Sequence, residues 1–100
     1  MAEPLFAVVA ANDQMALGVM HALHERGRSI PGEVSVVGFD DTEVARLLSP
    51  PLTTVRQPLR EMGRVAVLSA LRLAAGETLE SHHVELATEL VVRSSTAPVS

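Results

Sequence analysis

The chain has 100 residues, enough for at most one small domain, and its composition is that of a globular protein, with 47% hydrophobic and 20% charged residues. The formal net charge is −4, and the eight positive charges are all arginines that are scattered along the chain. Proteins that bind duplex DNA gain much of their affinity from clustered positive charge facing the phosphates. We therefore expect that these residues do not bind nucleic acid by themselves.

The chain contains neither cysteine nor lysine. The first absence excludes disulfides, thiolate catalysis and cysteine zinc sites, and the second excludes a Walker-type phosphate loop and Schiff-base chemistry. No serine lies in a Gly-x-Ser-x-Gly setting. We therefore predict that the chain is not an enzyme and needs no cofactor. The start of the chain does not resemble a signal peptide and no apolar run could cross a bilayer, so we expect a cytoplasmic chain without a membrane partner.

The first predicted elements are a strand and a helix. Residues 5–10 form an unbroken apolar run, which is typical of a strand buried on both faces in a parallel sheet. Asn12 or Asp13 can cap the helix that follows, and we expect this helix to run to about Arg26 and to stop at Gly27. Its apolar residues cover more of the circumference than one sheet can bury. A second subdomain or a second copy of the chain should therefore pack against it.

The rest of the chain continues the alternation of strands and helices. We predict a strand, a short helical turn, a strand, a helix and an extended stretch over residues 34–39, 42–48, 53–56, 57–76 and 82–92. This order predicts an α/β fold, namely a parallel open sheet with flanking helices and right-handed crossovers.

Polar side chains follow each of the first three predicted strands. Asn12 and Asp13 follow the first strand, Asp40 and Asp41 the second, and Gln57 the third. Ligands of open parallel sheets bind outside the carboxyl ends of the strands. A carboxylate and amide rim there suits a neutral ligand with several hydroxyl groups better than a phosphate. The alternative is that these residues only cap a helix and end a strand.

Two groups of residues have the chemistry of metal ligands. Asp40 and Asp41 could bind Mg²⁺ through water, as the acidic pocket of response regulators does, but those proteins also need a lysine on a later strand. His21 and His24 lie three apart on the predicted helix, a spacing that permits joint metal ligation. Since no third ligand is in view, a solvated or interface position is favoured for both. We predict no metal site.

Three segments of the sequence closely resemble the LacI/GalR family of transcriptional repressors. They occur in the right order and at the right intervals, and they are Ala-Asn-Asp-Gln-Met-Ala-Leu-Gly at 11–18, Val-Ser-Val-Val-Gly-Phe-Asp-Asp-Thr at 34–42 and Pro-Pro-Leu-Thr-Thr-Val-Arg-Gln at 50–57. The resemblance implies the C-terminal portion of a two-lobed, type I periplasmic-binding-protein-like effector domain, with the DNA-binding helix-turn-helix absent. Residues 5–56 would then lie mainly in the C-terminal lobe, 57–86 would cross to the N-terminal lobe, and 87–100 would return.

The resemblance also implies roles for individual residues. The aspartate that matches Asp40 binds ligand hydroxyls in this family, and the positions of Asn12 and Gln57 face the cleft. Supporting roles are expected for Asp13, Gln14 and Asp41. A homodimer interface is expected through the first helix and the short helical turn, at Ala16, Leu17, Val19, Met20, Leu47 and Leu48.

The function implied is sugar-responsive effector sensing and dimerisation in a transcriptional regulator. The effector would be a sugar or a nucleoside, and operator DNA would be bound only through an N-terminal domain absent here. The alternative is a fragment of a periplasmic-type sugar-binding transport protein, which shares the fold. The start of the chain and the dimer residues favour the regulator.

Overall fold

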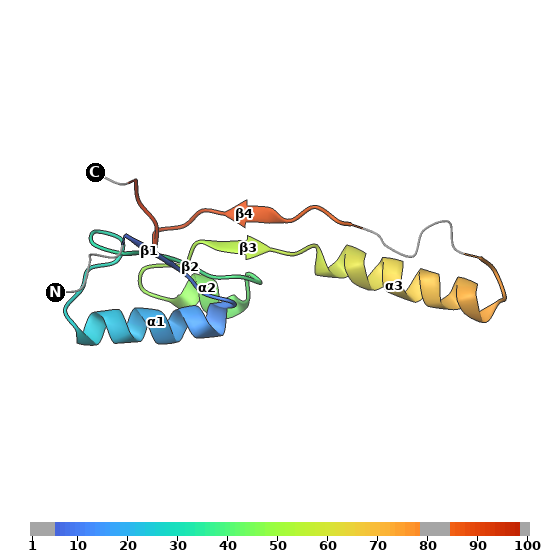
Figure 1. The fold of residues 1–100 in the computed structure, drawn as a ribbon, viewed down its shortest axis with the longest axis horizontal. Helices are drawn as coiled ribbons and strands as arrows, with labels where there is room; N and C mark the ends of the chain where they lie inside the picture. Colours follow the sequence, from blue (N-terminus) through green and yellow to red (C-terminus); the bar gives the residue numbers. More distant parts are fainter. Residues whose placement is uncertain (1–5, 79–84, 99–100) are drawn as a thin grey trace. The chain divides into compact units, whose positions relative to one another are not determined.

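The structure, a computed structural model, describes residues 6–78 and 85–98. In chain order the elements are β1 (Ala7–Val9), α1 (Asp13–Glu25), β2 (Ser35–Val37), α2 (Glu43–Leu47), β3 (Thr54–Arg56), α3 (Leu59–Ala74) and β4 (Glu89–Val91) (Figure 1). The predicted order of strands and helices is confirmed, although residues 82–84 of the last predicted stretch lie outside the described residues. The chain divides into two compact units, and the second unit is Gln57–Thr88.

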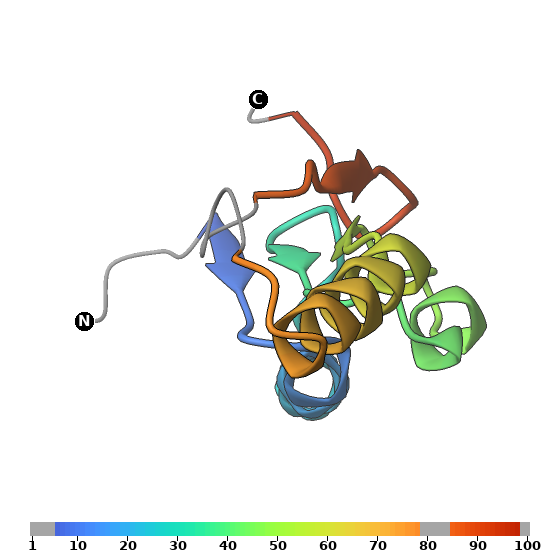
Figure 2. The ribbon, with the colours of Figure 1, turned by 90° about the vertical axis from the view of Figure 1, so that its right-hand side faces the viewer.

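The first unit contains two two-stranded sheets, β1 with β2 and β3 with β4, which isolated parallel bridges connect. β1 pairs with β2 in parallel, with Val8 opposite Val36, and a parallel bridge between Val37 and Thr53 continues the order towards β3. β1, β2 and β3 follow one another across the sheet, as Figure 2 shows. The predicted parallel arrangement is therefore confirmed. β4, in contrast, pairs with β3 in antiparallel fashion, with Leu90 opposite Val55.

Helix α1 begins and ends where the sequence predicts. The side-chain oxygen of Asn12 accepts a hydrogen bond from the backbone N–H of Met15 at 2.8 Å, which satisfies a donor that the first turn cannot pair internally. At the other end, Gly27 has a φ of +68°, a conformation that costs glycine little, and its N–H donates to the carbonyl of His24 at 3.0 Å.

The core of the first unit lies between α1, α2 and one face of the sheet. Its buried apolar residues are Ala10, Ala16, Met20, Val34, Val36, Ala45 and Leu52. The prediction that the first strand is buried on both faces is wrong. Val8 packs against the core, but Ala7 and Val9 are exposed, because among the described residues of this unit nothing covers the side of the strand to which they point.

The segment after β4 completes the sheet. Ser95 is fully buried, and its hydroxyl donates to the carbonyl of Val36 at 2.6 Å and accepts from the N–H of Thr53 at 2.8 Å. The carbonyl of Ser95 also accepts from the N–H of Val36 at 2.9 Å. Ser95 thus links Val36 of β2 to Thr53, the residue before β3, beside the bridge between Val37 and Thr53.

The second unit contains α3, a helix without buried residues. Its exposed apolar side chains include Leu59, Met62, Val67, Leu68, Leu71 and Leu73. The predicted end of this helix is confirmed, since α3 stops at Ala74 and Gly76 follows with a φ of +81°. Within the part of the chain that the structure describes, no helix has both the length and the apolar character needed to cross a membrane.

Candidate functional site

The carboxyl ends of β1 and β2 bring two of the predicted site residues to one edge of the sheet. Asn12 follows β1 and Asp40 follows β2, and the pairing of the two segments continues past the strands, since the N–H of Asp13 donates to the carbonyl of Phe39 at 3.0 Å. The N–H of Asp40 also donates to the carbonyl of Val55 in β3, at 2.9 Å. Gln57 comes directly after β3, where the second unit begins.

Asn12 caps helix α1 and keeps two side-chain N–H donors that the cap does not use. Its Oδ1 caps α1, as described above, and the side chain is half-buried. An asparagine amide also carries two N–H donors, which the cap does not use. Gln14, in the first turn of the same helix, is exposed.

Asp13 is fully buried and is the hub of this region. Its Oδ2 accepts hydrogen bonds from the N–H and the hydroxyl of Thr42, at 2.6 and 3.0 Å, and its Oδ1 accepts from the hydroxyl of Thr54 at 2.6 Å. A buried carboxylate is tolerated only when donors of this kind satisfy it. Asp13 therefore connects the start of α1 with the loop after β2 and with β3.

The backbone of Asp40 and Asp41 is unusual. Both residues have a positive φ, of 111° for Asp40 and 54° for Asp41. Residues with a side chain rarely adopt such angles, because each instance costs about 1–3 kcal/mol and persists only where the surroundings enforce it. The loop that carries Asp40 is therefore held in place by its neighbours.

Asp41 lies at the centre of an ion-pair cluster. Its Oδ2 accepts from Nε of Arg56 and its Oδ1 from Nη2 of Arg93, both at 2.7 Å, and its side chain is 9% exposed. Burial acts to raise the pKa of Asp41, but the hydrogen bonds and positive charges of the two arginines outweigh it, and the pKa lies below its usual value. In return, the carboxylate raises the pKa of Arg56. Asp41 is therefore ionised in the folded protein at neutral pH.

Arg93 is the functional candidate that the sequence analysis missed. Besides its bond to Asp41, its Nη1 donates to the carbonyl of Leu52 at 2.9 Å and its N–H to the hydroxyl of Thr53 at 2.9 Å. It is separated from Asp41 by 52 positions in the sequence. No local pattern could have indicated a contact over this separation.

The residues predicted to form a dimer interface differ in their exposure. Leu47 on α2 is 76% exposed and Leu17 on α1 is 36% exposed, whereas Val19 and Leu48 are half-buried. Ala16 and Met20 belong to the core, with exposures of 0% and 3%, so they have little surface to offer a partner.

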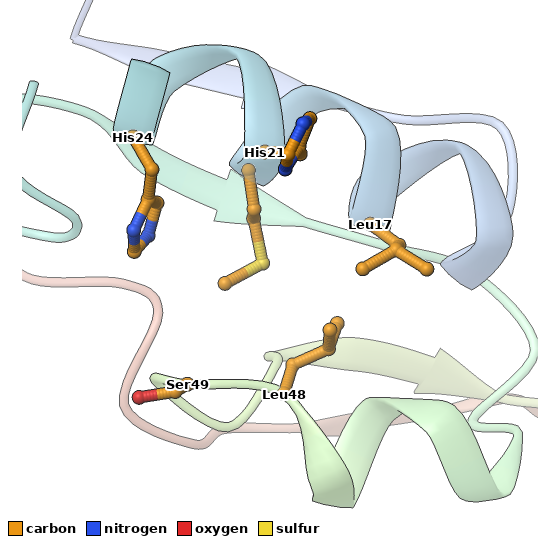
Figure 3. A pocket seen from close by; sticks show the side chains of 6 residues that line it. Leu17, His21, His24, Leu48 and Ser49 are labelled. Atoms are coloured by element: carbon orange, nitrogen blue, oxygen red, sulfur yellow. The ribbon is translucent and has the colours of Figure 1, made fainter. Parts of the chain in front are cut away.

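An open hollow of about 180 Å³ lies between α1 and the segment after α2 (Figure 3). It is lined by Leu17, Met20, His21, His24, Leu48 and Ser49. His21 points its Nε2 towards Glu25 at 2.7 Å along the same helix. Among the described residues, no three histidine or acidic side chains are grouped as they would be to hold a metal ion.

Comparison with known proteins extends over nearly the whole chain. Residues 1–96 match the family described as the periplasmic binding protein-like domain. The lactose operon repressor of Rhizobium radiobacter is 47% identical over 89 residues, which cover 89% of this chain and 78% of that protein. The MalR regulator of Streptomyces coelicolor is 46% identical over 91 residues, which cover 91% of this chain but only 26% of that protein. The chain thus spans about a quarter of the length of such longer relatives.

Solved structures of transcriptional regulators are also similar to this chain. A complex of the transcriptional regulator CelR with cellobiose matches 90% of this chain and 28% of its own, with a TM-score of 0.85 and 42% identity. A lac repressor dimer bound to operator matches 93% of this chain and 32% of its own, with a TM-score of 0.85 and 41% identity. The fold is therefore that of a periplasmic-binding-protein-like domain. The chain belongs to the LacI/GalR family of transcriptional regulators, as its motifs indicate.

Proposed function

We propose that this chain is the effector-sensing and dimerisation part of a transcriptional regulator, and that its effector is a neutral sugar or nucleoside bound at Asp40, Asn12 and Gln57. The observation that carries the proposal is that Asn12 and Asp40 follow the carboxyl ends of two adjacent parallel strands. Two similar structures are described as complexes with sugars, one with cellobiose and one with D-xylulofuranose. Gln57 is included because it completes the third family motif.

The chemistry of this edge favours hydroxyl groups over an anion. A carboxylate such as that of Asp40 can accept from two neighbouring hydroxyls, and the amide hydrogens of Asn12 can donate to a sugar oxygen. The two arginines that contact the adjacent Asp41, Arg56 and Arg93, already have this carboxylate as their partner. An anionic ligand would therefore meet the carboxylate of Asp40, while the two arginines beside it are already engaged by Asp41.

Replacing Asp40 by asparagine tests this assignment. Loss of the carboxylate removes charge-assisted hydrogen bonds from the ligand, so the affinity for a bound sugar should fall by roughly ten- to a hundredfold. The measurement is a titration of the 100-residue chain with cellobiose, lactose, xylose, ribose and adenosine, followed by amide NMR shifts. Glu43→Gln is the matched control, since Glu43 is an exposed acid in the first turn of α2. Equal affinities of Asp40→Asn and the parent chain for a binding sugar would refute the role of Asp40.

We propose in addition that the chain forms a homodimer through α1 and α2. The support is the exposure of Leu47 and of Leu17, which lines the open hollow, together with the description of a similar repressor as a dimer. Leu47→Glu would place a charge in such an interface and should shift the chain from dimer to monomer in sedimentation velocity. Leu90→Glu, which changes an equally apolar residue of β4 with 61% exposure, should leave the dimer intact. If Leu47→Glu and Leu90→Glu have the same sedimentation coefficient, the dimer interface does not include α1 and α2.

Operator binding is assigned to a part of the whole protein outside these residues. The chain carries a net charge of −4 and spans only 26% of relatives such as MalR, which are named as HTH-type regulators. In this proposal the chain has no catalytic role and works in the cytoplasm, where transcription takes place. The alternative of a sugar-transport protein is less well supported, because the curated relatives described above are both regulators of transcription.

A further inference from the structure

The loop after β2 adopts a conformation that its own sequence does not favour. Asp40 and Asp41 have φ angles of 111° and 54° in succession, and neither residue is a glycine. The direction of the Asp40 side chain depends on this backbone, because the bond from Cα to Cβ turns with the local φ. If Asp40 relaxed to an ordinary negative φ, its carboxylate would point elsewhere.

Contacts of Asp40 and Asp41 with other segments of the chain hold this conformation. The Asp41 carboxylate is fastened by Arg56 and Arg93, and the N–H of Asp41 donates to the hydroxyl of Thr54 at 3.3 Å. On the other side of Asp40, its own N–H bonds to the carbonyl of Val55. The backbone of Asp40 is therefore held on one side by Val55 and on the other by the contacts of Asp41.

The two arginines are not equivalent. The Arg56 side chain is half-exposed, and its Nη1 lies 3.7 Å from Oε2 of Glu89. Water and this second carboxylate therefore compete with Asp41 for the Arg56 guanidinium. The Arg93 side chain is only 14% exposed, and its second guanidinium nitrogen is held by the carbonyl of Leu52. A guanidinium group that other hydrogen bonds already hold in place loses little conformational entropy when it binds a carboxylate. Arg93 is therefore the firmer of the two anchors.

We propose that Arg93 is a positioning residue for the effector site: by holding Asp41 it keeps the backbone of Asp40 in its left-handed conformation and thereby fixes the direction of the Asp40 carboxylate. Arg93 does not touch the ligand in this proposal. The consequence for binding rests on the function proposed above, whereas the effect on the loop does not. The two can therefore be tested separately.

The first test needs no ligand. In Arg93→Leu, the HN–Hα coupling constants and the amide shifts of Asp40 and Asp41 should move away from those of the parent chain, while the amides of Val8 and Val36 in the sheet stay in place. Arg93→Lys keeps the positive charge but lacks the paired guanidinium nitrogens, so it should show an intermediate change. This variant also replaces Arg93→Leu in the test if Arg93→Leu does not fold. Arg46→Leu, at an exposed arginine of α2, is the control and should change neither aspartate. Unchanged couplings of Asp40 in both Arg93 variants would overturn the proposal.

The second test uses whichever sugar binds the parent chain in the titration described above. At a temperature where all variants are fully folded, Arg93→Leu should weaken binding roughly tenfold, with partial recovery in Arg93→Lys. A role confined to stability would lower the melting temperature without changing affinity, and that result would also overturn the proposal. If no sugar moves the Asp40 amide in the parent chain, the proposed function fails, and the ligand-free couplings still decide whether Arg93 positions the loop.

Discussion

Asp13→Ala is expected to lower the free energy of unfolding of the first unit by about 3–5 kcal/mol. The substitution removes the acceptor of three hydrogen bonds, and each buried donor left without a partner costs about 1–3 kcal/mol. The hydroxyl of Thr54 is fully buried and has no access to water as a substitute. Small domains have a total stability of about 5–15 kcal/mol, so this one change removes a large part of it.

Urea unfolding followed by circular dichroism measures the effect. Asp13→Asn should fall between the parent chain and Asp13→Ala, because its amide keeps one accepting oxygen but turns an N–H donor towards another donor. Gln14→Ala is the neighbouring control. Its side chain is exposed, and its effect should stay within about 0.5 kcal/mol. If Asp13→Ala were as stable as Gln14→Ala, the three hydrogen bonds would contribute nothing to the fold.

Gly38→Ala is expected to lower the free energy of unfolding by about 1–3 kcal/mol, the usual range for overpacking a closed core. An added methyl carbon would lie 2.5 Å from Oδ1 of Asp13 and 2.7 Å from Cδ2 of Leu52. Asp13 is held by its three donors and Leu52 is fully buried, so neither neighbour can move aside without losing contacts of its own. The same unfolding experiment measures the loss.

Gly18→Ala provides a control with the opposite sign. Gly18 lies within α1, and an added methyl carbon would meet nothing within 4 Å. Alanine is a better helix former than glycine by about 1 kcal/mol, so this variant should be more stable than the parent chain. If both glycine variants shifted stability in the same direction, backbone entropy and not the space around Gly38 would control the result.

Much of the architecture could be predicted from the sequence, because it depends on local patterns. Short apolar runs indicated the strands, Asn12 and Gly27 marked the ends of α1, and the alternation of elements implied parallel strands. The same reasoning placed Asn12 and Asp40 after adjacent strand ends, where they lie. These properties follow from periodicity, capping and chain order, which act over a few residues at a time.

The remaining features were decided only by the tertiary structure. Arg93 meets Asp41 across 52 positions and Ser95 meets Val36 across 59, and β4 turned out antiparallel. The hydrogen bonds of Asp13 and the exposure of Val9 likewise depend on which distant segments surround them. A periodic pattern shows which side chains share a face, but it carries no information on which remote segment lies opposite that face. The partners of buried charges are therefore fixed only when the chain packs.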